Sequence, residues 1–186
     1  EHDSVKKKYQ DTLNKTVTTD KMVSNIYFLS DSEPVITTAR CSGDSLYSDY
    51  LSSTQGQIVK GDKYNFYLLG NQCETDEKMG TSSDKYGARL VRYLNGAKAL
   101  MVVDIDKACI EDTLSSLDGG AGSMVSLVTQ DGTEYVKKDG ETTSETVFYG
   151  TDFYQKACEA EEEKGAEYVQ YNGEQYLFLY ARIEGR

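Results

Sequence analysis

Several residue types that carry common enzyme chemistry are scarce or missing in this 186-residue chain. Tryptophan is absent, there is one proline, and His2 is the only histidine. A single histidine at the start of a chain cannot complete a Ser-His-Asp or Cys-His arrangement or a histidine-based zinc site. The sequence also lacks a Gly-rich phosphate loop and a twelve-residue calcium loop. We therefore expect no catalytic residues, no metal and no cofactor.

Acidic residues outnumber basic residues in this chain. The chain has 20 Lys and Arg against 31 Asp and Glu, which gives a formal net charge of −11. Phosphate backbones favour clustered Lys and Arg, and only Lys6, Lys7 and Lys8 cluster here. We expect neither nucleic acid nor an anionic membrane surface as a partner. No apolar run approaches the roughly 20 residues that span a bilayer, and residues 183–186 match a protease-cleavage linker, either native or vector-derived.

The cysteines are spread along the chain without CxxC spacing, so the sequence contains neither a zinc knuckle nor a thioredoxin motif. They lie at Cys41, Cys73, Cys109 and Cys158. Two interpretations stay open. The four are buried small apolar residues, or they form one or two disulfides in an oxidising compartment.

The first 61 residues are predicted to be mainly helical. Val5, Tyr9, Leu13 and Val17 are spaced by four and mark one narrow stripe of a helix over residues 3–30. Such a stripe packs either on the rest of the domain or on a twin helix. Shorter helices are expected over residues 34–41 and 45–53, before a loop that reaches residue 61.

The rest of the chain shows a β pattern with hairpin turns. Asn95-Gly96, Asp131-Gly132 and Asn172-Gly173 each separate two β-favouring runs, and such dipeptides are typical of type I′ turns. Helices are predicted between the hairpins, over residues 106–117 and 152–164. The order of elements indicates an α+β fold with an antiparallel sheet.

Three of these runs resemble Cache domains, the extracellular PAS-like sensors of bacterial receptors. The likeness is carried by ALMVVDI at residues 99–105, SMVSLVTQDGT at residues 123–133 and YVQYNGEQYLFLYA at residues 168–181. It covers roughly residues 88–183. The resemblance implies a PAS-like antiparallel five-stranded sheet with covering helices and a long N-terminal helix. We divide the chain into an N-terminal helical segment, residues 1–61, and a PAS-like sensor module, residues 62–186, in preference to a reduced double module.

The resemblance also implies a function. Cache domains sense small molecules outside the cell, between two membrane helices of a chemoreceptor, histidine kinase or diguanylate cyclase. We therefore expect a non-enzymatic extracytoplasmic domain that binds an amino acid, a carboxylate or an amine, and a homodimer through the N-terminal helix. The family's amino-acid motif contains a tryptophan that this chain lacks. The alternative is a cell-surface adhesion module without a ligand, which would show a filled core and an exposed apolar patch. A carboxylate hydrolase would need acids such as Glu74 and Asp76 to converge in one cleft.

A PAS-like pocket lies between the sheet and the segment that covers it, here expected over residues 138–153. An arginine in such a pocket clamps a carboxylate through two hydrogen bonds, and a tyrosine provides an apolar wall with one hydroxyl. The other interpretation of the same residues is that they are solvated or ion-paired surface groups. The candidate ligand-binding residues are Arg89, Arg92, Tyr93, Tyr149, Asp152 and Tyr180.

Overall fold

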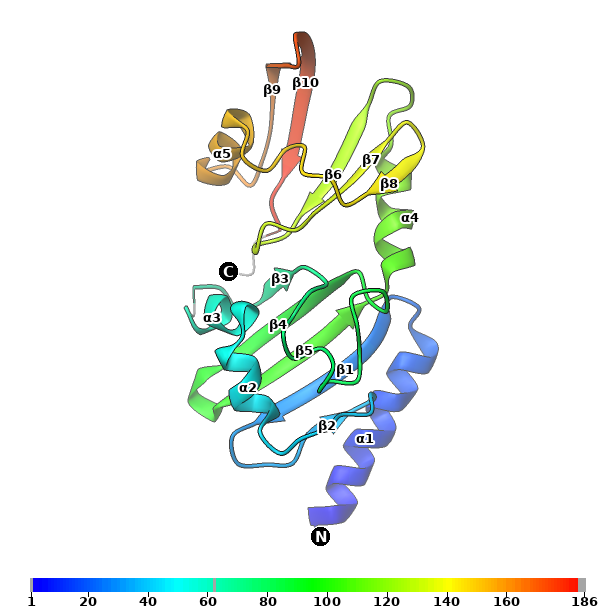
Figure 1. Cartoon of the computed structure of the whole chain (residues 1–186), viewed down its shortest axis with the longest axis vertical. Helices are drawn as coiled ribbons and strands as arrows, with labels where there is room; N and C mark the ends of the chain where they lie inside the picture. The colour runs from blue at the N-terminus through cyan, green and yellow to red at the C-terminus, as the bar shows by residue number, and fades with distance from the viewer. Residues whose placement is uncertain (1, 62, 184–186) are drawn as a thin grey trace.

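Five strands from the first 105 residues form the largest sheet, sheet A (Figure 1). The computed structural model describes residues 2–61 and 63–183, so residues 184–186 of the predicted linker lie outside the described part. The order in sheet A is β2-β1-β5-β4-β3, and every neighbouring pair is antiparallel. Its strands are β1 (Val23–Ser30), β2 (Ile36–Thr37), β3 (Tyr67–Leu69), β4 (Ala88–Leu94) and β5 (Ala99–Ile105).

One face of sheet A, the covered face, is buried at its centre. Side chains alternate along the strands, and this face carries Tyr27 and Leu29 from β1, Val91 from β4 and Val102 from β5, each with 0% exposure. The helices α2 (Leu46–Ser52) and α3 (Thr54–Lys60) pack on it together with residues 70–87. The side chain of Ser53 caps α3 by accepting a hydrogen bond from the Gly56 N–H.

The N-terminal helix is shorter than predicted. α1 (His2–Thr19) ends before β1, so the expected helix over residues 3–30 is wrong for its last third. Residues 23–30 are apolar or aromatic at most positions, and pairing with β2 and β5 on either side fixes them as a strand. α1 lies against β1 and β2, where the Gln10 Nε2 donates to the Thr37 carbonyl at 2.5 Å.

The helix expected over residues 34–41 is also wrong. This stretch contains β2, in which Ile36 and Thr37 pair with Phe28 and Tyr27 of β1. The next expectation, a helix over residues 45–53, is confirmed by α2. Sheet A therefore draws strands from both sides of residue 61.

The second half of the chain begins with α4 (Lys107–Leu117), whose first turn is capped by Asp106. A three-stranded sheet B follows, with β6 (Met124–Val128), β7 (Glu134–Lys138) and β8 (Glu141–Thr143) in the order β6-β7-β8. Next come α5 (Asp152–Glu159) and a separate hairpin of β9 (Lys164–Tyr171) and β10 (Glu174–Ala181). α5 is shorter than the predicted helix over residues 152–164, because β9 already begins at Lys164.

The predicted five-stranded antiparallel sheet is present, but it consists of residues 23–105 instead of the second half. There, the five strands β6–β10 form one sheet of three and one of two. All three hairpins are confirmed. Asn172 and Gly173 have φ values of 51° and 82°, as a type I′ turn requires. The Asn95-Gly96 connection differs, because residues 95–98 form a longer loop with Lys98 at φ 46°.

The two halves are joined by more than α4. The Gln130 N–H donates to the Leu68 carbonyl at 2.9 Å, and the Leu68 N–H donates to the Gln130 side-chain oxygen at 2.6 Å. The Tyr135 hydroxyl donates to the Gly87 carbonyl, next to an apolar cluster that includes Ala88 and Leu114. Sheet B is therefore fixed to the β3–β4 side of sheet A.

Candidate functional site: the buried Arg89 cluster

Arg89 forms a bidentate ion pair in the middle of the covered face. It stands directly opposite Asp104 in the β4–β5 ladder, and both side chains have 0% exposure. The Arg89 Nε lies 2.6 Å from Asp104 Oδ1, and Nη2 lies 3.1 Å from Oδ2. Arg89 is thus ion-paired within the chain, and its two-hydrogen-bond contact is with the chain's own carboxylate; that it binds a ligand stays a prediction.

Three further side chains complete what we call the Arg89 cluster: Asp76, Tyr86 and Gln55. Arg89 Nη1 lies 3.0 Å from Asp76 Oδ1 and 3.5 Å from Gln55 Oε1. The Tyr86 hydroxyl donates to the two Asp76 oxygens at 3.0 and 2.9 Å. The ring centroid of Tyr86 lies 4.5 Å from Arg89 Cζ, within the range of a cation–π contact.

The covering segment, residues 70–87, is held in place from several sides. Gln55 on α3 donates to the Gly70 and Gln72 carbonyls at 3.0 and 3.1 Å. Glu74 accepts from the Thr54 N–H at the start of α3 at 3.1 Å. Glu74 and Asp76 thus bind different partners, a helix end and an arginine, and they do not converge in the common cleft that a carboxylate hydrolase would need.

Burial dominates the electrostatics of the covered face. Burial alone would lower the pKa of Arg89, but the nearby Asp104 carboxylate raises it by more, so the pKa of Arg89 lies well above its usual value. Burial raises the pKa of Asp104, and Arg89 works against that rise. Burial likewise raises the pKa of Tyr27, and the nearby Asp104 carboxylate adds to the rise. Two carboxylates share one guanidinium here, and only Asp76 reaches the surface, with 12% side-chain exposure.

The structure places the six predicted ligand-binding residues in three regions. Arg89 and Tyr93 share the covered face of β4, whereas Arg92 is exposed on its opposite face. Tyr149 is 48% exposed, and its ring lies over Gly132 in the turn after β6. The remaining two are at the far end of the molecule: Asp152 begins α5 and lines an open groove of about 250 Å³ between α5 and β9, and Tyr180 on β10 packs over Gly165.

A third buried carboxylate, Glu134 on β7, was not predicted. It is 3% exposed and accepts from the consecutive N–H groups of Val147, Phe148 and Tyr149 at 2.9–3.2 Å. Ser126 adds a hydroxyl donor at 2.8 Å. Part of the expected cover over residues 138–153 is thus fixed on sheet B by Glu134. The sequence could not predict this contact, because a single acidic residue in a β-favouring run is not a recognisable motif.

The cysteines are free thiols in the structure. Cys158 is exposed and the other three are half-buried, and burial raises the pKa of the Cys41 thiol. The described residues contain no cluster of three or more side chains suited to hold a metal ion. Within residues 2–61 and 63–183, no helix is both long and apolar enough to cross a membrane.

Comparison with protein families and with curated proteins finds no match to this chain. The fold and the geometry of the Arg89 cluster are therefore the basis for a functional conclusion.

Proposed function

We propose that the chain is an extracytoplasmic ligand-sensing domain of a bacterial transmembrane receptor, of the Cache type. The observation that carries the proposal is the all-antiparallel order β2-β1-β5-β4-β3, with α2 and α3 inserted between β2 and β3 and packed on one face. A five-stranded antiparallel sheet with helices that cover one face is what the resemblance to PAS-like sensor domains implies. The membrane helices of the receptor would lie outside this chain.

The second half of the chain supports the reduced double form of the family more than the single form. α4 leads from sheet A into a second unit with its own sheet, its own covering segment and a late hairpin (Figure 1). Because sheet B is hydrogen-bonded to β3, a shift of one unit is transmitted to the other. A sensor needs such a connection between its ligand site and its output.

The ligand site would be the covered face of sheet A. Asp76 is the one cluster carboxylate that reaches solvent, and it occupies only Nη1 of Arg89. A small carboxylate that takes the place of Asp76 would keep the bidentate Arg89–Asp104 pair intact and free the segment of residues 70–87 to move. This favours carboxylates, amino acids among them, over amines.

The test is a thermal-shift screen of amino acids, organic acids and amines against the wild-type chain and Asp76→Asn. We expect a saturable rise in melting temperature with at least one small carboxylate, at lower concentration in Asp76→Asn because the competing charge is gone. Asp49→Asn, which removes a carboxylate paired with Lys78 on the surface, is the matched control and should respond like wild type. If neither protein responds to any compound, the sensor proposal fails. If only amines bind, the site on Arg89 is wrong but the sensor proposal stands.

One observation favours the alternative, an adhesion module without a small-molecule ligand. The covered face is filled by protein side chains, while Tyr168, Leu177 and Leu179 are exposed by 72%, 53% and 66% on the β9–β10 hairpin. A filled core together with an exposed apolar patch is what such a module would show. A protein partner that binds the chain while the ligand screen stays negative would decide for this function.

A further inference from the structure

The β9–β10 hairpin borders an open groove of about 250 Å³ on the side of α5. One wall consists of Asp152, Phe153 and Lys156 from α5, and the other consists of residues 167–170, four consecutive residues of β9. Successive side chains of a strand point to opposite faces of its sheet. Four consecutive residues can therefore line one groove only at the edge of the strand. Figure 1 shows α5 beside β9 and β10 on the other side, so this is the edge of β9 that points away from β10, the free edge.

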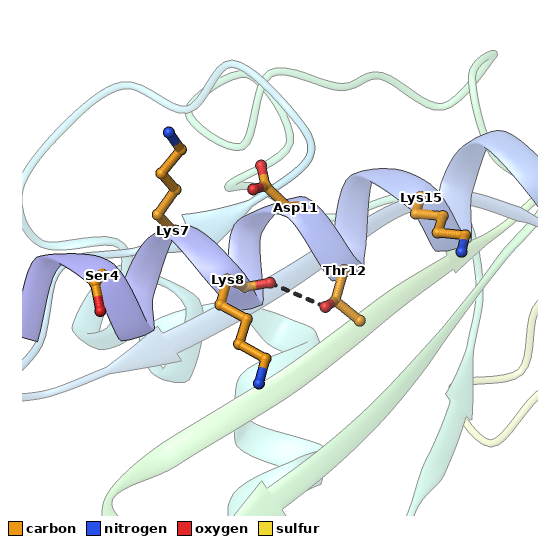
Figure 2. A pocket seen from close by; sticks show the side chains of 6 residues that line it. All are labelled: Ser4, Lys7, Lys8, Asp11, Thr12 and Lys15. Atoms are coloured by element: carbon orange, nitrogen blue, oxygen red, sulfur yellow. Dashed lines mark hydrogen bonds between the residues drawn. The ribbon is translucent and has the colours of Figure 1, made fainter.

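The groove differs from a larger hollow of about 360 Å³ on α1. That hollow is lined by the side chains of one helix alone, and Figure 2 shows Lys7, Lys8 and Lys15 extending from the helix in different directions. Side chains that spread into solvent do not converge on a ligand. The α5–β9 groove, in contrast, has a helix on one side and the edge of a strand on the other.

The backbone of the free edge is available for pairing. The two-residue turn at Asn172-Gly173 makes Tyr171 and Glu174 the closing hydrogen-bonded pair of the hairpin. Hydrogen-bonded and non-hydrogen-bonded pairs alternate along an antiparallel ladder, so Gln170 and every second residue before it direct their N–H and C=O groups away from β10. Among the described residues, no strand pairs with this edge. β9 also contains no proline, the residue that would block such pairing.

The charge of the groove favours a basic occupant. Glu167 is half-buried, and it makes no hydrogen bond or ion pair with any other described residue. Asp152 adds a second carboxylate to the lining, against the ammonium group of Lys156. Four further glutamates lie within residues 159–163, at the end of α5 and just after it. A lysine or arginine opposite Glu167 in an added strand would form the opposite-charge pair that stabilises neighbouring strands.

The next position on the same face of β9 favours an apolar side chain. Val169 lies two residues from Glu167, and both share the face of Phe178, whose ring centroid is 4.8 Å from that of Phe153 on α5. Antiparallel pairing is slightly more stable than parallel pairing. In an antiparallel strand, the side chain opposite Val169 comes two residues before the one opposite Glu167. At about 3.3 Å per residue, the groove-lining part of β9 spans about 13 Å, the length of a short extended segment.

We propose that the free edge of β9 binds an extended segment of a partner protein, which adds to the hairpin as a third strand in the α5–β9 groove. The segment has a β-branched residue and, two positions later, a lysine or arginine, so that these side chains lie opposite Val169 and Glu167. In this mode of recognition, main-chain hydrogen bonds supply affinity and alternate side chains supply specificity. The site is separate from the Arg89 cluster, and it does not depend on whether the covered face binds a carboxylate.

The probe is the peptide acetyl-TTVTKTT-amide, titrated into isotope-labelled protein and followed by amide resonances and hydrogen exchange. For wild type we expect saturable shifts and slower exchange at Tyr168 and Gln170, whose N–H groups point out of the hairpin. Tyr168→Pro removes one of these N–H groups without removing a hydrogen bond to β10, and it should weaken binding about tenfold. Tyr168→Thr is the matched control, because it removes the same 72% exposed side chain and keeps the N–H. It should bind like wild type.

A second pair of variants tests the charge. Glu167→Gln removes the carboxylate that should contact the peptide lysine, and we expect binding to weaken about two- to fivefold. Glu162→Gln removes an exposed carboxylate that does not line the groove, and its effect should be clearly smaller. Replacing the peptide lysine by glutamate should weaken binding to wild type, and this loss should be smaller in Glu167→Gln because the two changes remove the same contact.

Absence of saturable binding to wild type would overturn the proposal, as would equal binding by Tyr168→Pro and Tyr168→Thr. Sedimentation equilibrium identifies a different occupant. If wild type without peptide is a dimer of 20.8 kDa chains and Tyr168→Pro is a monomer, a second copy occupies the edge and the partner assignment is wrong. Asp76→Asn should bind the peptide like wild type, which keeps this test distinct from the ligand screen.

Discussion

Asp104→Asn should be among the most destabilising single substitutions in the chain. It leaves a guanidinium with 0% exposure opposite a neutral amide, and the amide nitrogen meets one of the two Arg89 donors that the carboxylate accepted. Removing one partner of a buried ion pair costs about 3–5 kcal/mol. For a chain of this length, each kcal/mol lowers the melting temperature by roughly 2–4 °C. We expect a drop of about 6–20 °C.

The assay is urea unfolding followed by far-UV circular dichroism and tyrosine fluorescence, which suits a chain with 15 tyrosines and no tryptophan. Arg92→Gln is the matched control, because it removes an exposed arginine on the opposite face of the same strand. Its effect should stay within about 0.5 kcal/mol. Replacing all three charged groups in Asp76→Asn/Arg89→Met/Asp104→Leu should recover most of the loss, since no uncompensated charge remains in the Arg89 cluster. A loss below about 1 kcal/mol for Asp104→Asn would refute the reasoning, as would a triple variant that is no more stable than the single one.

Two further predictions concern the other carboxylates. Glu134→Ala leaves three partly buried N–H groups without their acceptor, so we expect a cost of about 1–3 kcal/mol and faster hydrogen exchange at residues 147–149. The exposed Glu141→Ala is the control that should change neither. The hydrogen bond from the Thr54 hydroxyl lowers the pKa of Glu74 in the folded protein. The contact therefore stabilises the fold fully above the unfolded pKa of about 4.3, and this stabilisation is lost as the pH falls through the lower folded pKa. The stability difference between wild type and Thr54→Val should therefore be largest near neutral pH and shrink toward pH ~3, and a difference that grows on acidification would contradict this sign.

The sequence predicted the class of fold better than the position of its main sheet. Hairpins marked by Asn-Gly or Asp-Gly could be located because the turn chemistry is local. The error at residues 23–30 has a physical cause. Apolar residues at positions 23, 26 and 29 fit a helical spacing, but residues 26–29 are apolar throughout, as in a strand between two neighbours. Pairing with β2 and β5 decides that these residues form a strand and not a helix, and β5, the longer partner, is distant in sequence.

The Arg89 cluster could be predicted in part. The sequence indicated that Arg89 would contact a carboxylate, either of a ligand or in an ion pair, but the ion-pair partners Asp104 and Asp76 could not be named from the sequence. Asp76 lies in a loop, and Gln55 comes from a different helix, so no local pattern brings them to Arg89. Arg89 lies opposite Asp104 because residues 95–98 connect β4 and β5. The Asn95-Gly96 dipeptide instead predicts a connection of two residues.

That connection explains why the ion pair matters. A two-residue turn at Asn95-Gly96 would pair Leu94 with residue 97, and the ladder would then place Val102 opposite Arg89. The observed loop pairs Leu94 with Ala99 and so brings Asp104 opposite Arg89. Both registers keep the same face buried, because they differ by two residues. Hydrophobic patterning therefore cannot distinguish them, whereas the slipped register would separate the buried Arg89 guanidinium from Asp104.

We infer that the pair specifies the register of β4 and β5 more than it stabilises the fold. The Asp76→Asn/Arg89→Met/Asp104→Leu variant tests this, because it removes the penalty on the slipped register without leaving a charge in the Arg89 cluster. We expect it to unfold with near wild-type stability and yet to show two sets of amide resonances for β4 and β5, with the rest of the spectrum single. A single set of resonances with wild-type cross-strand contacts would mean that the four-residue loop fixes the register without the ion pair.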